Sequence, residues 1–370
     1  MSFDRLLVVR LSAMGDIIHT LPAAALLRQA FPQATLGWLV EERWAELLCT
    51  LRYPRSGRRS RQRPLVDRLH TVNTAEWRHA LLSFNTWQQM AVGLSQLRGI
   101  QYDAVIDFQG AVRSALLARW SGAPIVWGSA QPRENAASMF YTRTVLTEGV
   151  HVVEQTLNLT RALSPLSGSR TAGTALHVQF PSDPDAERQV AGLVSAGSNF
   201  AILNPGAGWG AKRWPAERYG QLARELAKEG LGSLVNYGPG ELQLAEAVEA
   251  TSAGAARRVC CSVSELIALT RRARLFVGGD TGPMHLAAGL KIPVVAIFGP
   301  TSPARNGPYG TPSIVLRRPT SRTDHTRRHE PEQGLLEITV GEVVAAARKL
   351  LADSVADFRT AKARPPDSGE

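Results

Sequence analysis

The chain has 370 residues, 44% of them hydrophobic and 20% charged, and a formal net charge of +10. This composition fits a folded protein long enough for two domains of ordinary size. No run approaches the 18 or so apolar residues of a membrane span, and the N-terminus moves straight into a strand-like run, so the sequence predicts neither a spanning helix nor a signal peptide. The positive charge indicates an anionic partner, which could be nucleic acid, an acidic lipid surface or a phosphorylated substrate.

The three cysteines, Cys49, Cys260 and Cys261, lack the spacing of a metal site and cannot all pair with one another. A reducing cytoplasm is therefore the simpler location, and we expect these side chains to be packing residues.

The first half of the chain alternates between apolar runs and helix-like segments. Residues 5–11 predict a strand that leads through a Gly-containing turn into a helix closed by Pro32. Asp16 lies at the start of that helix, where the helix dipole favours a carboxylate, and also at the carboxyl end of the strand, where α/β sheets place ligands. Further strands are predicted at 35–40, 68–72, 103–108 and 125–127, and helices at 42–51, 86–98, 114–120, 132–141 and 152–163.

An arginine-rich segment interrupts this alternation. Residues 52–63 contain six arginines and no acidic residue. Such a segment cannot bury a core, so we expect a mobile basic loop. It could be a solvated insertion, or it could contact the phosphates of a lipid, another polyanion or nucleic acid.

The second half repeats the α/β pattern after a linker rich in Ser, Gly and Pro at residues 164–174. Strands are predicted at 200–204, 233–237, 274–277 and 294–298, and helices at 215–228, 241–250, 262–272, 282–289 and 340–352. The sequence therefore predicts two doubly wound parallel sheets, in domains spanning residues 1–168 and 175–352, followed by a frayed polar tail at 353–370.

Three glycine-containing loops follow predicted strands of the second half: residues 206–212, 238–241 and 280–285. Glycine lets the backbone approach a ligand, Lys212 can neutralise a phosphate, and Glu241 can accept hydrogen bonds from ribose hydroxyls. Together the loops outline a site for a nucleotide diphosphate. Each loop alone also fits surface charge or an ordinary capped helix. The glycine motifs of nicotinamide enzymes and P-loop NTPases do not occur in the right place.

Two histidines have a spacing that can bind a metal on a helix, His325 and His329. Their surroundings are cationic and turn-like, so the sequence predicts no metal site. His19 fits a structural histidine.

Several motifs together resemble the bacterial lipopolysaccharide heptosyltransferases of glycosyltransferase family 9. They are SAMGDIIHTLP near the start, YDAVIDFQG and PRENAASMFY in the first half, NPGAGWGAKRWP in the middle, and GGDTGPMHLAAGLKIPVVAIFGPTSP near the end. The similarity covers nearly the whole chain, and the first motif is closer to heptosyltransferase I than to heptosyltransferase II.

This resemblance implies a GT-B fold, an α/β architecture of two Rossmann-like domains facing across a cleft. It implies inverting transfer of L-glycero-D-manno-heptose from an ADP-heptose donor, bound mainly by the C-terminal domain, to a Kdo residue of the lipid A inner core. No cofactor and no metal are expected. The enzyme would act as a peripheral protein at the anionic cytoplasmic face of the inner membrane, without a nucleic acid partner. The alternatives are heptosyltransferase II or another family 9 enzyme, and a non-catalytic basic protein that binds anionic lipid or nucleic acid.

The resemblance also implies roles for single residues. Asp16 matches the family's general base, and Lys212 matches the lysine that contacts the donor diphosphate. Glu241 falls near the ribose-binding glutamate. The DTG-x-x-H signature around the donor corresponds to Asp280, Thr281, Gly282 and His285.

On the acceptor side, Arg133 matches an arginine of the family. The family's cluster of consecutive basic residues corresponds to residues 75–79, where only Arg78 and His79 keep a basic character. This departure leaves the exact acceptor open, and the arginine-rich segment could take over phosphate contacts.

Overall fold

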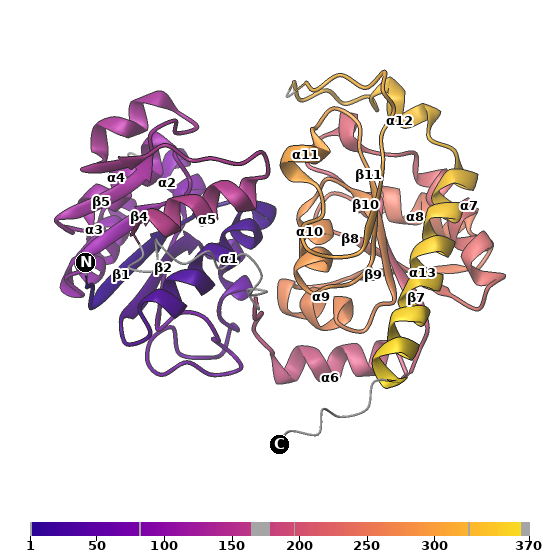
Figure 1. Cartoon of the computed structure of the whole chain (residues 1–370), viewed down its shortest axis with the longest axis horizontal. Helices are drawn as coiled ribbons and strands as arrows, with labels where there is room; N and C mark the ends of the chain where they lie inside the picture. The colour runs from indigo at the N-terminus through magenta and orange to yellow at the C-terminus, as the bar shows by residue number, and fades with distance from the viewer. Residues whose placement is uncertain (1, 81–82, 164–177, 196, 325, 364–370) are drawn as a thin grey trace. The chain divides into compact units, whose positions relative to one another are not determined.

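A computed structural model describes residues 2–80, 83–163, 178–195, 197–324 and 326–363. The chain divides into two compact units, Met1–Glu187 and Arg188–Glu370. Each unit contains one parallel sheet with helices on its faces (Figure 1). The predicted linker at residues 164–174 lies outside the described residues, and the predicted domain limits stay predictions.

The sheet of the first unit has six parallel strands within the described residues, in the order β3-β2-β1-β4-β5-β6. Its strands are β1 (Arg5–Val9), β2 (Thr35–Glu41), β3 (Arg68–Val72), β4 (Ala104–Asp107), β5 (Ile125–Ser129) and β6 (Arg143–Val145). The helices of this unit are α1 (Met14–Ala30), η1 (Glu42–Leu47), α2 (Thr74–His79), α3 (Phe84–Gly99), α4 (Val112–Trp120), η2 (Asn135–Phe140) and α5 (Val152–Leu163).

The sheet of the second unit is also parallel and six-stranded in the described part, with the order β12-β11-β10-β7-β8-β9. Its strands are β7 (Phe200–Asn204), β8 (Gly232–Tyr237), β9 (Ala256–Cys260), β10 (Leu275–Gly279), β11 (Val294–Ile297) and β12 (Ser313–Leu316). The helices are α6 (Pro184–Leu193), η3 (Gly210–Lys212), α7 (Ala216–Ala227), α8 (Leu242–Thr251), α9 (Val263–Thr270), α10 (Gly282–Gly289), α11 (Pro303–Asn306), α12 (Gln333–Glu337) and α13 (Val340–Ala363), of which α6 crosses the boundary between the units.

The two sheets have the same topology. Counted from its own first strand, each follows the order 3-2-1-4-5-6 of the Rossmann fold. The strand order reverses between β1 and β4 in the first unit and between β7 and β10 in the second. Ligands of open α/β sheets bind outside the carboxyl ends of the strands at this switch point. The fold therefore marks two places, one in each unit, where functional residues are expected.

Burial on both faces explains the apolar strands. Every residue of β4, β7, β10 and β11 is buried, as parallel strands covered by helices on both sides require. In the second unit α9 and α10 lie on one face of the sheet, and α7 and α13 lie on the other (Figure 1).

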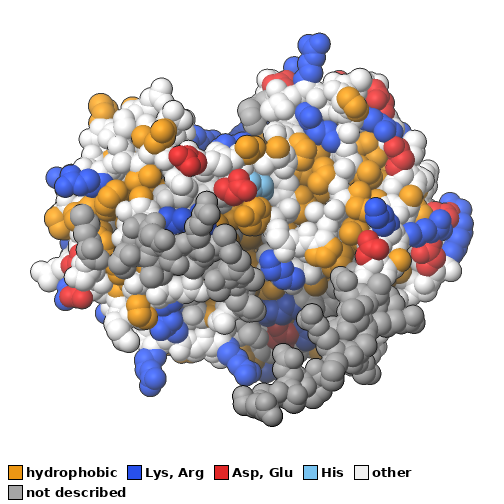
Figure 2. All heavy atoms as spheres, viewed as in Figure 1, with side chains coloured by type: hydrophobic (Ala, Val, Ile, Leu, Met, Phe, Trp, Pro, Cys, Tyr) orange, Lys and Arg blue, Asp and Glu red, His pale blue; other side chains and the backbone are white. Residues whose placement is uncertain are grey.

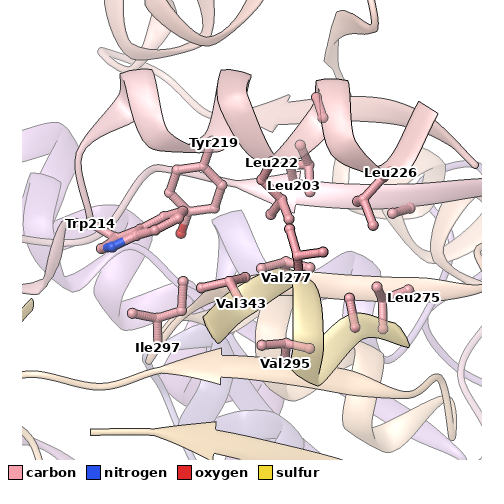
Figure 3. Packing of buried hydrophobic residues seen from close by; sticks show 14 of the residues in the cluster. Leu203, Trp214, Tyr219, Leu222, Leu226, Leu275, Val277, Val295, Ile297 and Val343 are labelled. Atoms are coloured by element: carbon pink, nitrogen blue, oxygen red, sulfur yellow. The ribbon is translucent and has the colours of Figure 1, made fainter. Parts of the chain in front are cut away.

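The core of the second unit is anchored by two aromatic side chains. The rings of Trp214 and Tyr219 meet edge to face, with their centroids 4.9 Å apart. They lie beside Ile297 and Val343 (Figure 3). The indole N–H of Trp214 donates to the carbonyl of Ile338 at 3.0 Å, which ties the segment before α13 to the loop before α7.

Most predicted elements are confirmed within a few residues, and Ser262 caps α9 by accepting from the Glu265 N–H at 3.2 Å. The predicted helices at 42–51 and 132–141 are short 3₁₀ helices instead. The last helix continues to Ala363, past the end predicted at residue 352. The strands β6, β9 and β12 were not predicted, because short or charge-bearing edge strands carry little of the apolar signal of a central strand.

The expectation of a mobile arginine loop at residues 52–63 is wrong, because Arg63 is fully buried at its centre. The Arg63 guanidinium donates to the carbonyls of Val66 (3.0 Å), Gly57 (2.6 Å) and Arg58 (3.0 Å), and also to that of Pro54. The loop thus folds around one buried cation whose donors are satisfied by backbone carbonyls. A search for apolar runs misses such a centre, because the residue that holds it is charged.

Basic side chains elsewhere are spread over the surface. Figure 2 shows Lys and Arg on the visible face of each unit, with Asp and Glu among them. Among the described residues, no helix combines the length and the apolar character needed to cross a membrane.

Replacing Arg63 with Met should unfold the loop, since it removes four hydrogen bonds to loop carbonyls and leaves the buried Val66 carbonyl without this donor. We expect a loss of about 2–4 kcal/mol in the free energy of unfolding. We also expect faster tryptic cleavage after Arg58 and Arg59, measured by mass spectrometry. Arg61→Met, at an exposed position of the same loop, is the control and should change neither quantity. Equal cleavage rates in wild type and Arg63→Met would contradict the role of Arg63.

Candidate active site

The switch point of the second unit brings together the ends of β7 and β10. Gly278 pairs with Asn204 in the sheet, and a Cβ atom at Gly278 would lie 3.1 Å from the Asn204 carbonyl oxygen. The Asn204 side chain accepts from the Asn236 amide at 2.7 Å, which joins the ends of β7 and β8. The three strand ends that precede the predicted donor loops are therefore fixed against one another.

A buried ion pair joins two of these loops. Lys212 Nζ lies 2.7 Å from Asp280 Oδ2 and donates to the Asp280 carbonyl oxygen at 3.0 Å. Asp280 Oδ1 lies 3.2 Å from His285 Nε2, one turn along α10. The side chains of Lys212, Asp280 and His285 are 12%, 7% and 6% exposed. The structure thus brings together three residues predicted from separate parts of the sequence.

The charge of Asp280 is stabilised against its burial. Burial alone would raise the pKa of this carboxyl, but the hydrogen bond with His285 and the positive charge of Lys212 outweigh it. They hold the pKa of Asp280 well below its ordinary value of 3.8. The carboxylate is therefore ionised at neutral pH and fixes the position of the lysine.

Glu241 is the last residue of the glycine loop at 238–241 and lies beside the loop at 206–212. Its Oε2 accepts from the Gly238 N–H at 2.9 Å. A Cβ atom at Gly206 would lie only 2.2 Å from the Glu241 carboxylate, so a side chain there would displace Glu241 from this position. The structure thereby places Glu241 beside the loop that leads to Lys212.

Thr281 and Gly282 form the start of α10. Thr281 is the N-cap residue, but its hydroxyl donates to the Gly279 carbonyl at 3.3 Å and does not cap the helix. Gly282 is the first helical residue. A helix N-terminus that begins at a switch point can bind an anion through its backbone N–H groups.

The loop that carries Lys212 has further basic and aromatic neighbours that the sequence reasoning missed. Lys212 Nζ lies 4.4 Å from the ring centroid of Trp209, and the Arg327 guanidinium lies 5.9 Å from it. The Ala211 N–H donates to the Arg328 carbonyl at 3.1 Å. This bond holds the backbone at Arg328 against the loop that carries Lys212. Of the two histidines considered for a metal, His325 lies outside the described residues.

Asp16 lies at the switch point of the first unit, in the first turn of α1. Its Oδ1 lies 2.9 Å from Arg10 Nη2, and its Oδ2 accepts from the Ala13 N–H at 3.1 Å. The side chain is 36% exposed, whereas Arg10 is 9% exposed. Arg10 also donates to the carbonyl of Phe108. The contacts with Arg10 and with the Ala13 N–H therefore fix the orientation of the Asp16 carboxylate, while part of the side chain stays exposed to solvent.

Residues that position the Asp16 loop come from both central strands. Gln109, after β4, accepts from the N–H groups of Leu11 (3.0 Å) and Ser12 (3.2 Å) after β1. Arg113 donates to the Ser12 hydroxyl at 3.2 Å. Arg10, Gln109 and Arg113 escaped prediction, although a charged residue directly after a buried strand, as at Arg10, is a usable signal.

A second carboxylate near this switch point, Asp107, has a structural role. Burial raises its pKa, and it accepts hydrogen bonds from the Tyr141 hydroxyl (2.8 Å), the Ser114 hydroxyl (2.9 Å) and the Gln109 N–H (2.8 Å). It is 2% exposed and cannot meet a substrate. Asp16, at 36% exposure, is the more accessible of these two carboxylates.

The two arginines predicted on the acceptor side differ in what the structure describes. Arg133 has an exposed side chain. A Cβ atom at Gly110, where φ is +66°, would lie 2.9 Å from the Arg133 backbone nitrogen, so the segment is packed against the turn after β4. Arg78 belongs to α2, and its side chain lies outside the described residues.

These features define a class of protein. Two Rossmann-ordered sheets in one chain have a partly exposed carboxylate at one switch point and glycine-containing loops with a buried lysine at the other. Two such domains in one chain are the architecture of a GT-B glycosyltransferase.

Comparisons with known proteins give the family. The sequence model of glycosyltransferase family 9 (heptosyltransferase) matches residues 93–336. Lipopolysaccharide heptosyltransferase 1 of Pseudomonas aeruginosa is 32% identical over 324 residues, which cover 84% of this chain and 83% of the relative. The chain therefore belongs to glycosyltransferase family 9 and is a heptosyltransferase, as its motifs predicted.

Solved structures agree with this assignment. The E. coli heptosyltransferase WaaC with ADP superposes with a TM-score of 0.74 at 27% identity, covering 94% of this chain and 99% of that one. WaaC with ADP-2-deoxy-2-fluoro heptose gives a TM-score of 0.73 at 28% identity, with coverage of 93% and 99%. The GT-B fold predicted from the resemblance is thereby confirmed.

The ion pair of Asp280 predicts how stability depends on pH. Because the pKa is lower in the folded protein than in the unfolded chain, the carboxylate stabilises the fold fully above about pH 5 and progressively less as the pH falls through 4. Asp280→Asn should therefore be less stable than wild type at pH 7, and the difference should shrink towards pH 3. Chemical denaturation from pH 7 to pH 3 measures this. A difference that stays constant would contradict the assignment.

Proposed function

We propose that this enzyme transfers L-glycero-D-manno-heptose from ADP-heptose to a Kdo residue of the lipid A inner core, with inversion at the anomeric carbon, in lipopolysaccharide core biosynthesis. The observation that carries the proposal is the buried Lys212, Asp280 and His285 cluster beside the start of α10. It fixes the ammonium group of Lys212 at the switch point where a sugar nucleotide would leave its diphosphate. The similarity to heptosyltransferases, and to WaaC structures with ADP and with ADP-2-deoxy-2-fluoro heptose, supports this donor class.

Donor binding is assigned to the second unit, in the proposed domain of residues 175–352. Lys212 would contact the diphosphate, since Asp280 holds its ammonium group in place. The N-terminus of α10, at Thr281 and Gly282, would stabilise the departing ADP through its N–H groups. Glu241 would accept from the ribose hydroxyls.

Proton transfer is assigned to Asp16, in the proposed acceptor domain of residues 1–168. Its carboxylate would take the proton of the acceptor hydroxyl while that oxygen forms the new bond to the anomeric carbon. The bond between that carbon and the diphosphate breaks in the same displacement, and ADP leaves with the electron pair. A single displacement inverts the configuration. The exposure of Asp16 and its fixed orientation beside Arg10 support this role.

The acceptor is an anionic glycolipid in this proposal. Arg133 and Arg78 would contact its carboxylate or phosphate groups. The enzyme would work as a peripheral protein on the cytoplasmic face of the inner membrane, where a net charge of +10 favours the anionic surface.

The test of the function is transfer of heptose from ADP-heptose to Kdo-lipid A, compared with an acceptor that already carries one heptose. The proposal expects product with the first acceptor; product with the second acceptor alone would favour a heptosyltransferase II activity. Asp16→Asn should lower the turnover number by about 10²- to 10⁴-fold, because it removes the base. ADP affinity, measured by calorimetry, should stay unchanged. Near-normal turnover of Asp16→Asn would remove Asp16 from the role of base.

Lys212→Met should act on the donor instead. Losing a charge-assisted hydrogen bond to the diphosphate should weaken ADP binding by about 10- to 100-fold. The control is Lys228→Met, an exposed lysine of the same unit that pairs with Glu225. Circular dichroism at the calorimetry temperature shows whether each variant is folded. An unchanged ADP affinity in folded Lys212→Met would contradict the assignment.

A further inference from the structure

Helix α3 in the first unit presents apolar side chains to solvent. Phe84, Trp87 and Val92 are 83%, 55% and 50% exposed. At 100° per residue, Phe84, Trp87 and Ala91 share one side of the helix, and Val92 borders it. The only α3 residues that are buried are Thr86 and Leu97, among those that the structure describes. Few residues of α3 are buried, and aromatic rings lie on its outer side. Exposed apolar groups of this kind are typical of a surface that binds another protein or a membrane.

The side of α3 that faces the sheet lines a cavity. A cavity of about 540 Å³ separates the helix from the edge strand β3. Met90 and Leu94 of α3 line it together with Leu69 of β3, and Arg55 and Arg68 line it too. The arginine loop at residues 52–63 therefore borders the same cavity as α3.

The surroundings of the helix are basic. α3 contains no Asp or Glu, and Arg98 in its last turn is exposed. In the neighbouring loop Arg58 and Arg61 are exposed. Acidic partners engage three other loop arginines, since Asp185 pairs with Arg52, Glu42 with Arg55 and Asp67 with Arg59. The charge left at the surface of this region is positive.

We propose that α3 is an interfacial helix that docks on an anionic membrane surface. Phe84, Trp87 and Val92 would enter the boundary between headgroups and acyl chains, and Arg58, Arg61 and Arg98 would contact lipid phosphates. A lipid surface fits better than a protein partner because the outer side mixes two aromatic rings with Gln and Ser side chains and lies beside exposed arginines. Trp, with an apolar ring and one N–H donor, suits such an interface. The proposal rests on the proposed function only in that the acceptor is a membrane lipid.

The decisive experiment is vesicle flotation with the full chain and vesicles of phosphatidylglycerol and phosphatidylethanolamine. The double variant Phe84→Ser, Trp87→Ser should lower the partition coefficient by at least about tenfold, since it removes two aromatic side chains from the interface. The matched control is Leu193→Ser, a 40% exposed leucine at the end of α6, which should partition as wild type does. Neutral phosphatidylcholine vesicles should bind wild type more weakly.

A conservative change separates docking from folding. Trp87→Phe keeps an apolar ring and should keep most of the partitioning, whereas Trp87→Ser should lose it at an unchanged melting temperature. Equal flotation of wild type and the double variant would overturn the proposal, and so would an equal loss in Leu193→Ser. Capture of α3 by a protein partner with no vesicle binding would overturn it as well.

The two proposals fail in different assays. Transfer to a deacylated, water-soluble acceptor should be the same in wild type and in the double variant, because α3 contains no residue assigned to donor or acceptor binding. Wild type that makes no product with any Kdo acceptor would refute the proposed function, while its flotation would still report on α3.

Discussion

The proposed donor side of this enzyme depends on one requirement: the Asp280 carboxylate is buried and must be neutralised where it lies. Lys212 supplies the opposite charge from the segment after β7, and His285 supplies a hydrogen bond from within α10. Removing Lys212 would leave the carboxylate in the interior without its counter-ion, which costs far more than the pair itself contributes. The loop with Lys212 is therefore fixed relative to α10 before any ligand arrives. A site arranged in advance does not have to order its own groups when the substrate binds.

The glycines around the site allow close packing of its strand ends and loops. Gly278 packs against the end of β7, and Gly206 packs against the Glu241 carboxylate. A side chain at Gly278 would press against the Asn204 carbonyl at the end of β7, and one at Gly206 would displace the Glu241 carboxylate. These glycines therefore allow the strand ends and loops around the site to pack closely, in addition to any contact with a ligand.

Sequence reasoning reached the fold and named the residues that meet in the proposed donor site, because both rest on local signals. Apolar runs followed by glycine turns and helices identify the central strands, and Lys212, Asp280 and His285 stand in motifs with characteristic residues. It did not reach Arg10 or Gln109, because their partners are about 100 positions away or in another turn, and no periodicity links such residues. It also missed β9 and β12 at the sheet edge, since an edge strand buries one side and carries less apolar sequence.

Arg63 shows why net charge is a weak guide to where an anion binds. Six arginines without an acidic residue looked like a solvated basic segment, yet one of them is the buried centre of the loop, bonded to backbone carbonyls. Three more are paired with Asp185, Glu42 and Asp67, which lie outside the segment and so do not enter its local charge. A guanidinium has five N–H donors and can replace an apolar core in a short loop when carbonyls surround it. The charge available to a partner is what remains after these internal contacts, and in this region that remainder lies beside the exposed aromatic side of α3.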